Sequence, residues 1–271
     1  MRLVNFEGRL GLDVVGRFVD LEQVSQGRVS SDPMAAFSSW AEIRRLASEQ
    51  TVGDAGRLIL PERLGPPVPR PTQVFAIGLN DRDPAEEAGL PIPAQPMVFT
   101  KFQSGLAGPN TEVPLTSDRV DWEVEQVVVI GREARGVRAA NAWDHVAGFC
   151  VGQDVSDRGL QFADKPPQFS LGKSAPCFGP LGPALVSLDE IPNRDDMQLR
   201  CWIDGELVQD STTKNLIFPV PQLIEYLSRY CVLRPGDLIF TGTPAGVSAV
   251  VRGDVMEGAI AGLGTLKVVV K

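Results

Sequence analysis

Histidine is almost absent from this chain: His145 is the only one in 271 residues. A single histidine excludes metal sites built on two histidines, including the facial triad of non-haem iron enzymes. A Ser-His-Asp triad would have to use His145 itself. That residue lies in the segment 142–147, which is typical of a short helix entering a strand, and we do not expect it to be catalytic.

Cysteine is scarce and widely spaced. The four cysteines, Cys150, Cys177, Cys201 and Cys231, form no Cys-x-x-Cys pair. This spacing argues against a zinc ribbon and against a thioredoxin-like redox motif. We therefore expect reduced thiols that pack in the interior.

The chain also lacks a basic run and a long apolar stretch. Its formal net charge is -8 and its pI is near 4.8, so the electrostatic footprint of a nucleic-acid-binding protein is missing. Apolar runs such as 127–130 and 217–220 fall far short of the roughly 20 residues that span a bilayer. Asn5, Glu7 and Asp13 interrupt the N-terminus early, unlike a signal peptide. We expect a cytoplasmic protein with neither a nucleic-acid nor a membrane partner.

The residues that are present indicate a globular protein in two parts. Apolar residues make up 43% of the chain and charged residues 22%. Residues 1–65 show short alternating runs separated by glycines, which predict a small β-rich N-terminal domain, with a helix over 34–47 capped by Asp32. The proline-rich segment 64–71 predicts a semi-rigid connector. Residues 70–271 are the second predicted domain.

This second part predicts an α+β, mainly β architecture, because short Val, Ile and Phe runs alternate with turn signals and long helical patterns are few. Asp204-Gly205 is a strong two-residue hairpin signal. Pro221 suits the first turn of a helix over 220–230. Strands are predicted over 74–78, 123–130, 146–151, 199–203 and 238–240.

Two of these strands bring carboxylates together. The run after Glu125 is too apolar to be exposed on either face, so it must be an interior strand. Glu123 and Glu125 then project from the same face, about 6.5–7 Å apart along the chain. Such a pair needs a cation or a proton unless the strand end has already reached solvent, and for the pair alone solvent is the simpler explanation. Asp154, at the end of the next strand, makes a metal site an equal alternative.

The carboxylates belong to a larger set of motifs. In chain order the set is Ala76-Ile77-Gly78-Leu79-Asn80, Phe99-Thr100-Lys101, Asp121-Trp122-Glu123-Val124-Glu125, Gly152-Gln153-Asp154-Val155-Ser156-Asp157-Arg158, Leu171-Gly172-Lys173-Ser174 and Pro235-Gly236-Asp237-Leu238-Ile239-Phe240-Thr241-Gly242-Thr243-Pro244. Together these motifs resemble the fumarylacetoacetate hydrolase family over roughly residues 70–271. The resemblance implies the family's β-roll catalytic domain, usually as a homodimer.

The resemblance also implies a chemistry. It places Mg2+ or Mn2+ on Glu123, Glu125 and Asp154, and it implies a small-molecule substrate with a 2-oxo acid or β-dicarbonyl group whose two oxygens chelate the metal. The metal would act as a Lewis acid that stabilises the enolate formed when a C–C bond breaks.

Further residues match the family's site. Lys173 matches the active-site lysine, which would pair with the substrate carboxylate or the developing oxyanion. Gln209 and Thr243 match substrate-contacting positions, although both would serve equally well as turn residues. Arg82 is expected to contact the substrate, and Lys101 either contacts it or braces the site. Arg158 is the expected partner of a ligand carboxylate.

One segment departs from the family's pattern. Family hydrolases carry Asn-Tyr-x-x-His-x-x-Glu on a lid whose histidine and glutamate activate water, whereas this chain has Asp81 for the tyrosine and Pro84 for the histidine. Proline can neither give nor accept the proton, and a positioned base contributes typically 10²- to 10⁴-fold in rate. Glu87 is retained as the candidate catalytic base. Ala175-Pro176 also replaces the usual Asp-Thr pair after Lys173.

Two classes of function remain open from the sequence. The first is a metal-dependent enzyme, either a C–C hydrolase or lyase with a substitute base, or a decarboxylase, isomerase, dehydratase or cyclase that needs no activated water. The second is a catalytically silent relative that binds a metal or another ligand. Three converging carboxylates have no physical use in an idle site, which favours the enzyme.

Overall fold

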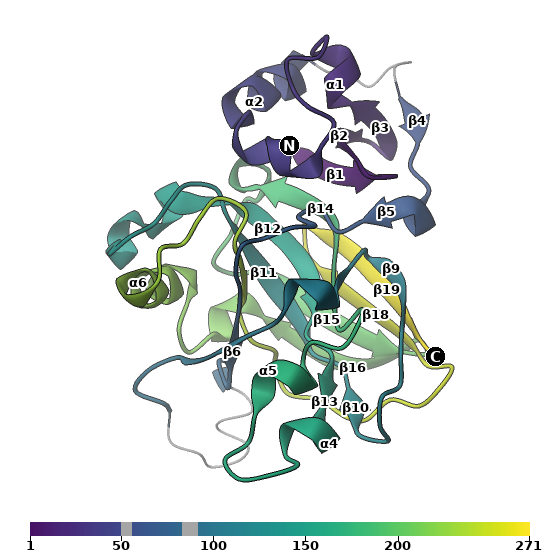
Figure 1. Cartoon of the computed structure of the whole chain (residues 1–271), viewed down its shortest axis with the longest axis vertical. Coiled ribbons are helices and arrows are strands. Elements are labelled where there is room, and N and C mark those ends of the chain that lie inside the picture. Colours follow the sequence, from purple (N-terminus) through teal and green to yellow (C-terminus); the bar gives the residue numbers. More distant parts are fainter. Residues whose placement is uncertain (50–55, 83–91) are drawn as a thin grey trace.

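The structure, a computed structural model, describes residues 1–49, 56–82 and 92–271. In these ranges the protein is α+β and mainly β, as the sequence predicts, and its largest sheet has twelve strands (Figure 1). They are β1 (Arg2–Phe6), β2 (Arg9–Val14), β3 (Arg17–Asp20), β4 (Arg57–Leu58), β5 (Leu64–Gly65), β6 (Val74–Gly78), β7 (Met97–Thr100), β8 (Leu106–Ala107), β11 (Val124–Ile130), β12 (Val146–Gln153), β14 (Gly179–Ser187) and β17 (Leu238–Phe240). The order is β4-β3-β2-β1-β14-β12-β11-β17-β6-β7, with β5 on β1 and β8 on β14.

Two smaller sheets complete the described part of the chain. A five-stranded sheet has the order β16-β15-β18-β19-β9, and β10 pairs with β13. Their strands are β9 (Asn110–Val113), β10 (Val120–Asp121), β13 (Ser156–Asp157), β15 (Gln198–Ile203), β16 (Glu206–Thr212), β18 (Val255–Ile260) and β19 (Gly264–Val270). The β15–β16 connection is the predicted hairpin. Asp204 and Gly205 have φ values of 49° and 84° there, which suits a tight turn between twisted strands.

β11 lies inside the molecule because both of its faces are apolar. Val124, Val128 and Ile130 pack in a core shared with the five-stranded sheet, whereas Val127 and Val129 pack in a second core on the opposite side. Alternate residues of a strand face opposite ways, so this division follows directly from the run of valines. The predicted interior strand is confirmed, and it begins at Val124.

The helices are short. They are α1 (Leu21–Val24), α2 (Trp40–Glu49), α4 (Arg158–Gln161), α5 (Phe169–Gly172), α6 (Val220–Tyr230) and the 3-10 helices Pro33–Phe37, Pro61–Arg63, Gln103–Gly105, Ala139–His145, Leu188–Glu190 and Thr213–Asn215. The helix predicted over 220–230 is confirmed as α6. No helix in the described ranges combines the length and the apolar character needed to cross a membrane.

The single helix predicted over 34–47 was wrong, although Asp32 does cap its start by accepting from Met34 N at 3.0 Å. A 3-10 helix ends at Phe37 and α2 begins at Trp40. Ser38 Oγ donates to Ala35 O at 3.1 Å. Ser38 and Ser39 separate the two helices, and serine is a weaker helix former than alanine or leucine.

The N-terminal strands continue the large sheet. β1 pairs antiparallel with β14 through Arg2–Val186 and Leu3–Leu185, and α2 lies with β1–β3 at the top of Figure 1. The second core contains N-terminal residues as well as residues of β11 and β12, including Leu12, Ile43 and Val127. The cluster of α4, α5, β10 and β13 lies at the opposite end of the molecule, at the bottom of the view.

Candidate functional site

Three carboxylates meet where β11 begins and β12 ends. Glu123, Glu125 and Asp154 are buried, and each offers one oxygen that lies within 4.8 Å of the other two. The antiparallel pairing of Val124 with Gln153 brings the two strand ends together, and Asp154 N donates to Glu123 O at 2.9 Å. The sequence motifs thus converge on one point.

Glu125 is the carboxylate with the least compensation. Its side chain is 1% exposed, and the hydrogen bond found for it comes from Gly242 N, at 2.8 Å. Burial, followed by the charges of Asp154 and Glu123, raises the pKa of Glu125 well above its usual value. Gly242 has a φ of +102°, in the left-handed region that favours glycine. No ion pair involves Glu125 in the described part of the chain.

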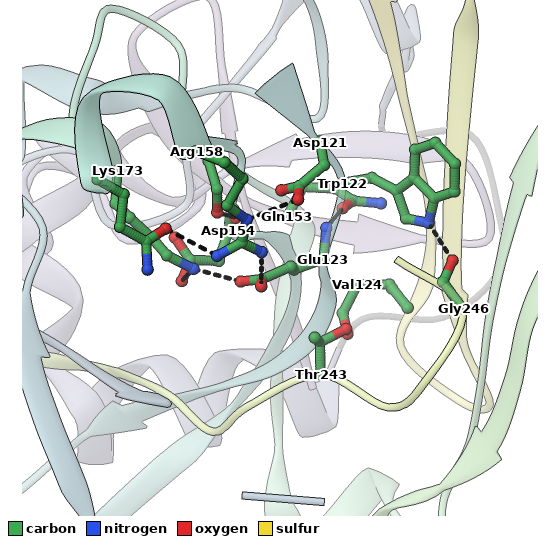
Figure 2. A network of polar contacts seen from close by, with 12 residues as sticks. Asp121, Trp122, Glu123, Val124, Gln153, Asp154, Arg158, Lys173, Thr243 and Gly246 are labelled. Carbon is green, nitrogen blue, oxygen red and sulfur yellow. Dashed lines mark hydrogen bonds and ion pairs between the residues drawn. The ribbon is translucent and has the colours of Figure 1, made fainter. Parts of the chain in front are cut away.

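Two buried lysines, Lys101 and Lys173, form ion pairs with the other two carboxylates, Asp154 and Glu123. Lys173 Nζ donates to Asp154 Oδ2 at 2.8 Å and to Glu123 Oε2, and it points at both in Figure 2. Lys101 Nζ donates to Asp154 Oδ1 at 2.5 Å and to the backbone oxygen of Lys173. Although burial opposes the charge of Lys173, Asp154 and Glu123 raise its pKa above the usual range. Burial lowers the pKa of Lys101, and both lysines help to hold that of Asp154 below its usual value against burial.

Arg158 links the cluster to a fourth acid, which the sequence did not single out. Its Nε donates to Asp121 Oδ2 at 2.6 Å and its Nη2 donates to Glu123 Oε1, as Figure 2 shows. Burial, and after it the charge of Glu123, raises the pKa of Asp121 to about 7 despite this arginine. Arg158 Nη1 also donates to Gln161 Oε1 at 2.8 Å. The predicted pairing of Arg158 with a site carboxylate is therefore present.

A cavity of about 690 Å3 opens beside the cluster. Glu123, Glu125, Arg158 and Lys173 line its polar side, together with Thr243. Its size lies within the roughly 300–1,000 Å3 that is usual for small-molecule sites. The carboxylate cluster is consequently open to a small ligand.

Thr243 and Gln209 contact each other and the backbone. Gln209 Nε2 donates to Thr243 Oγ1 and to Pro244 O, both at 2.9 Å, and its Oε1 accepts from Val124 N at 3.2 Å. Thr243 Oγ1 donates to Val124 O at 2.9 Å. Thr243 lines the cavity, whereas Gln209 does not. These bonds fix the start of β11, next to the glutamates.

The remaining predicted residues lie elsewhere. Arg82 is exposed and lines a separate hollow of about 330 Å3 with Gln126 and Lys214. Lys101 does not line the cavity and instead braces Asp154. Glu87 and Pro84 lie outside the described residues. His145 Nδ1 is 2.8 Å from Glu133 O and is not part of the site.

The donor set fits a hard divalent cation. Carboxylate oxygens are the ligands that Mg2+ and Mn2+ prefer, and three of them converge here on buried side chains. The uncompensated charge of Glu125 supports the same conclusion, because a buried carboxylate without a cation is costly. These three residues could hold one such ion.

Comparison with known proteins agrees with the fold and the motifs. The model of the fumarylacetoacetate (FAA) hydrolase C-terminal family matches residues 73–271. The chain belongs to the fumarylacetoacetate hydrolase family. A protein of Mycobacterium smegmatis provisionally described as HpcE is similar in structure, with a TM-score of 0.93 and 44% identity, covering 100% of this chain and 99% of that one.

Other family members differ in their named reactions. The mitochondrial oxaloacetate tautomerase FAHD2B of Bos taurus is 43% identical over 183 residues, which cover 67% of this chain. The match covers 58% of the cattle protein, so this chain spans less than two thirds of that relative. Maleylpyruvate hydrolase of Sphingobium sp. SYK-6, in complex with manganese(II) and pyruvate, is 27% identical at a TM-score of 0.84, covering 100% of this chain and 98% of that one. Hydrolases and tautomerases thus share this fold.

Proposed function

We propose that the protein is a divalent-metal-dependent enzyme acting on a 2-oxo acid or β-dicarbonyl substrate, with C–C bond hydrolysis as the first candidate reaction. Glu123, Glu125 and Asp154 hold the metal, and Lys173 stabilises developing negative charge beside it. The cavity next to this cluster receives the substrate. The manganese and pyruvate bound to the Sphingobium hydrolase support both the ion and the substrate class.

Glu125 is the observation that carries the proposal. Its carboxylate is fully buried, borders two other carboxylates and has one hydrogen bond, from Gly242, in the described structure. Such a group is stable as an anion only beside a cation. A bound Mg2+ or Mn2+ would supply that charge and, as a Lewis acid, would polarise the two oxygens of a dicarbonyl substrate.

The lysines and the arginine set the electrostatics around the carboxylates. Lys173 Nζ donates to Asp154 and Glu123, and these two carboxylates favour its charged form in the ion-free site. Lys173 therefore acts as a cation and a hydrogen-bond donor, and not as a base. Lys101 bonds to Asp154 and Arg158 bonds to Glu123, so both carboxylates are held in place. Together these side chains orient the ligand oxygens before a ligand arrives.

A second candidate reaction is a non-hydrolytic one, such as tautomerisation, isomerisation or decarboxylation. The specific observation in its favour is Pro84, which stands where family hydrolases have the histidine that activates water. The cattle relative named as an oxaloacetate tautomerase adds support. These reactions need charge stabilisation at the substrate oxygens but no attacking water.

Metal binding tests the shared basis of both reactions. We expect the wild type to bind one Mn2+ in calorimetric titration and the Glu125→Gln variant to bind it at least about tenfold more weakly, because a neutral amide replaces a charged ligand. Glu206→Gln, on the exposed β15–β16 hairpin, is the matched control and should bind like the wild type. Equal affinity in all three proteins would remove Glu125 from the metal site.

Turnover then separates the two reactions. Acylpyruvates and oxaloacetate, each with Mg2+ or Mn2+, are followed by their enol absorbance and by pyruvate release, with Glu123→Ala as the metal-site control. Hydrolysis of acylpyruvates releases pyruvate, whereas tautomerisation changes the enol absorbance without it. Metal binding without turnover of any substrate would instead favour a ligand-binding relative.

A further inference from the structure

Among the residues that the structure describes, the cavity offers no unpaired lysine or arginine. The acids at its wall are Asp81, Glu123 and Glu125, and the bases among the described residues are Arg158 and Lys173. Both bases already form ion pairs with Glu123. A bound divalent ion would serve one substrate carboxylate and leave a second one without a cation in this lining.

Apart from Gln161, Thr243 and two glycines, the rest of the wall is apolar. Phe99, Phe162 and Phe169 form an aromatic cluster, with ring centroids 5.5 Å apart for Phe99–Phe169 and 6.2 Å apart for Phe162–Phe169. They lie on or next to β7, α4 and α5. The other apolar lining residues are Ile77, Leu79, Met97, Pro244, Ala245 and Val247.

From this division we infer that the substrate carries an uncharged, apolar group at the end remote from its oxo acid. The inference rests on the proposed function and refines it to 2-oxo acids and acylpyruvates with an alkyl or aryl end. A second carboxylate at that end would be desolvated against aromatic and aliphatic side chains, with no unpaired lysine or arginine among the described lining residues. The volume of about 690 Å3 leaves room for such a group beyond an oxo acid of pyruvate's size.

Arg82 is the alternative cation for pairing with a second substrate carboxylate. It lines the separate hollow rather than this cavity. The segment 83–91 that follows it has the sequence DPAEEAGLP, which contains neither lysine nor arginine. If Arg82 served a second carboxylate, dicarboxylates would be good ligands of the wild type and poor ligands of an Arg82→Ala variant.

Binding of two inert acids tests the inference without any turnover. 2-Oxohexanoate and 2-oxohexanedioate have the same carbon chain and differ in a terminal carboxylate. For the Mn2+-loaded protein, calorimetry should give an affinity about 10- to 100-fold higher for 2-oxohexanoate. Equal or tighter binding of the dicarboxylate would overturn the inference, and so would failure of both acids to bind.

Turnover of a second matched pair separates this inference from the proposed function. 2,4-Dioxoheptanoate and 2,4-dioxoheptanedioate also share one carbon chain, and kcat/KM should favour the first by about 10- to 100-fold. If neither is cleaved, the proposed hydrolysis fails while the binding preference is still measured. If the dicarboxylate is cleaved equally well, the inference fails while hydrolysis stands.

A designed cation should weaken the preference for the monocarboxylate. Leu79 is 60% exposed at the cavity wall, so Leu79→Arg can place its guanidinium near the mouth without disturbing the core. We expect the binding ratio of the two oxo acids to fall at least about tenfold in this variant. Val251→Arg, at a residue 63% exposed outside the cavity, is the control and should leave the ratio unchanged. An unaltered ratio in Leu79→Arg and in an independent Val247→Arg would contradict the assignment of the apolar end.

Discussion

Gln209 joins two segments of the site through its side-chain amide. It bonds Val124 N at the start of β11 and Pro244 O in the loop after β17, and it is 1% exposed. The sequence left a substrate contact and a turn role equally open for this residue. The geometry favours a positioning role, in which the amide keeps the loop and the strand in register beside the glutamates.

Replacement of Gln209 by alanine tests that role. Gln209→Ala would leave a buried N–H and a buried carbonyl without partners, which should lower the free energy of unfolding by about 2–4 kcal/mol. Urea denaturation measures the change, with the exposed Gln198→Ala as control. A raised KM at unchanged stability would instead indicate a direct substrate contact.

Single residues also show where sequence reasoning ends for the site. Glu123, Glu125 and Asp154 could be grouped because strand periodicity and strand order place them on one face and at one end. The engagement of Lys101 with Asp154 joins residues 53 positions apart, and no local pattern encodes it. No local pattern in the sequence places Arg82, which is exposed and lines a separate hollow.

Asp157 organises the element at the mouth of the site. Its carboxylate accepts from Thr116 Oγ1 and Ser117 Oγ, both at 2.7 Å, and caps α4 through Leu160 N at 3.0 Å. Although burial opposes its charge, these bonds hold the pKa of Asp157 below its usual value. A lowered pKa in the folded state adds stability above the unfolded pKa of about 3.9, and this stability is lost as pH falls through the folded value.

The pH dependence of stability tests this cap. Asp157→Asn replaces one acceptor oxygen by a donor, so we expect it to be about 1–2 kcal/mol less stable than the wild type at pH 7. The difference should shrink as the pH is lowered below about 4, because the wild-type carboxyl then becomes neutral. Urea titrations at pH 7, 5 and 3.5 measure it. A difference that stays constant over this range would exclude the ionised cap.

At the level of elements, the strands were more predictable than the helices. β11 and α6 follow from local patterns, because an all-apolar run must be interior and a leucine-rich stripe must face a core. The break between the 3-10 helix and α2 was not predicted, because the helical pattern of the sequence continues through Ser38 and Ser39. The two-stranded sheet of β10 and β13 was not predicted, since its strands are two residues long.

One large sheet, from β4 to β7, contains strands from both sides of the proline-rich connector. The predicted division at the proline-rich connector 64–71 implies two folding units, whereas the pairing of β1 with β14 crosses that connector. A core that includes residues of β2, α2 and β11 crosses it as well. We therefore expect the chain to unfold in one cooperative transition.

Hydrogen exchange in urea, read by mass spectrometry, measures this directly. Peptides from residues 1–49 and from residues 146–187 should lose protection at the same urea concentration. Earlier loss in residues 1–49 would instead support two domains that unfold independently.

The site keeps its three carboxylates and most of its apolar wall on different elements. The carboxylates come from the adjoining ends of β11 and β12, while much of the apolar wall comes from β7, α4, α5 and the loop 243–247. Natural substitutions in the apolar wall can therefore change which substrates bind without altering the three carboxylates. Libraries directed at residues such as Phe162, Phe169 and Val247 should consequently yield new selectivities at high frequency, whereas libraries at the strand ends should yield mostly inactive protein.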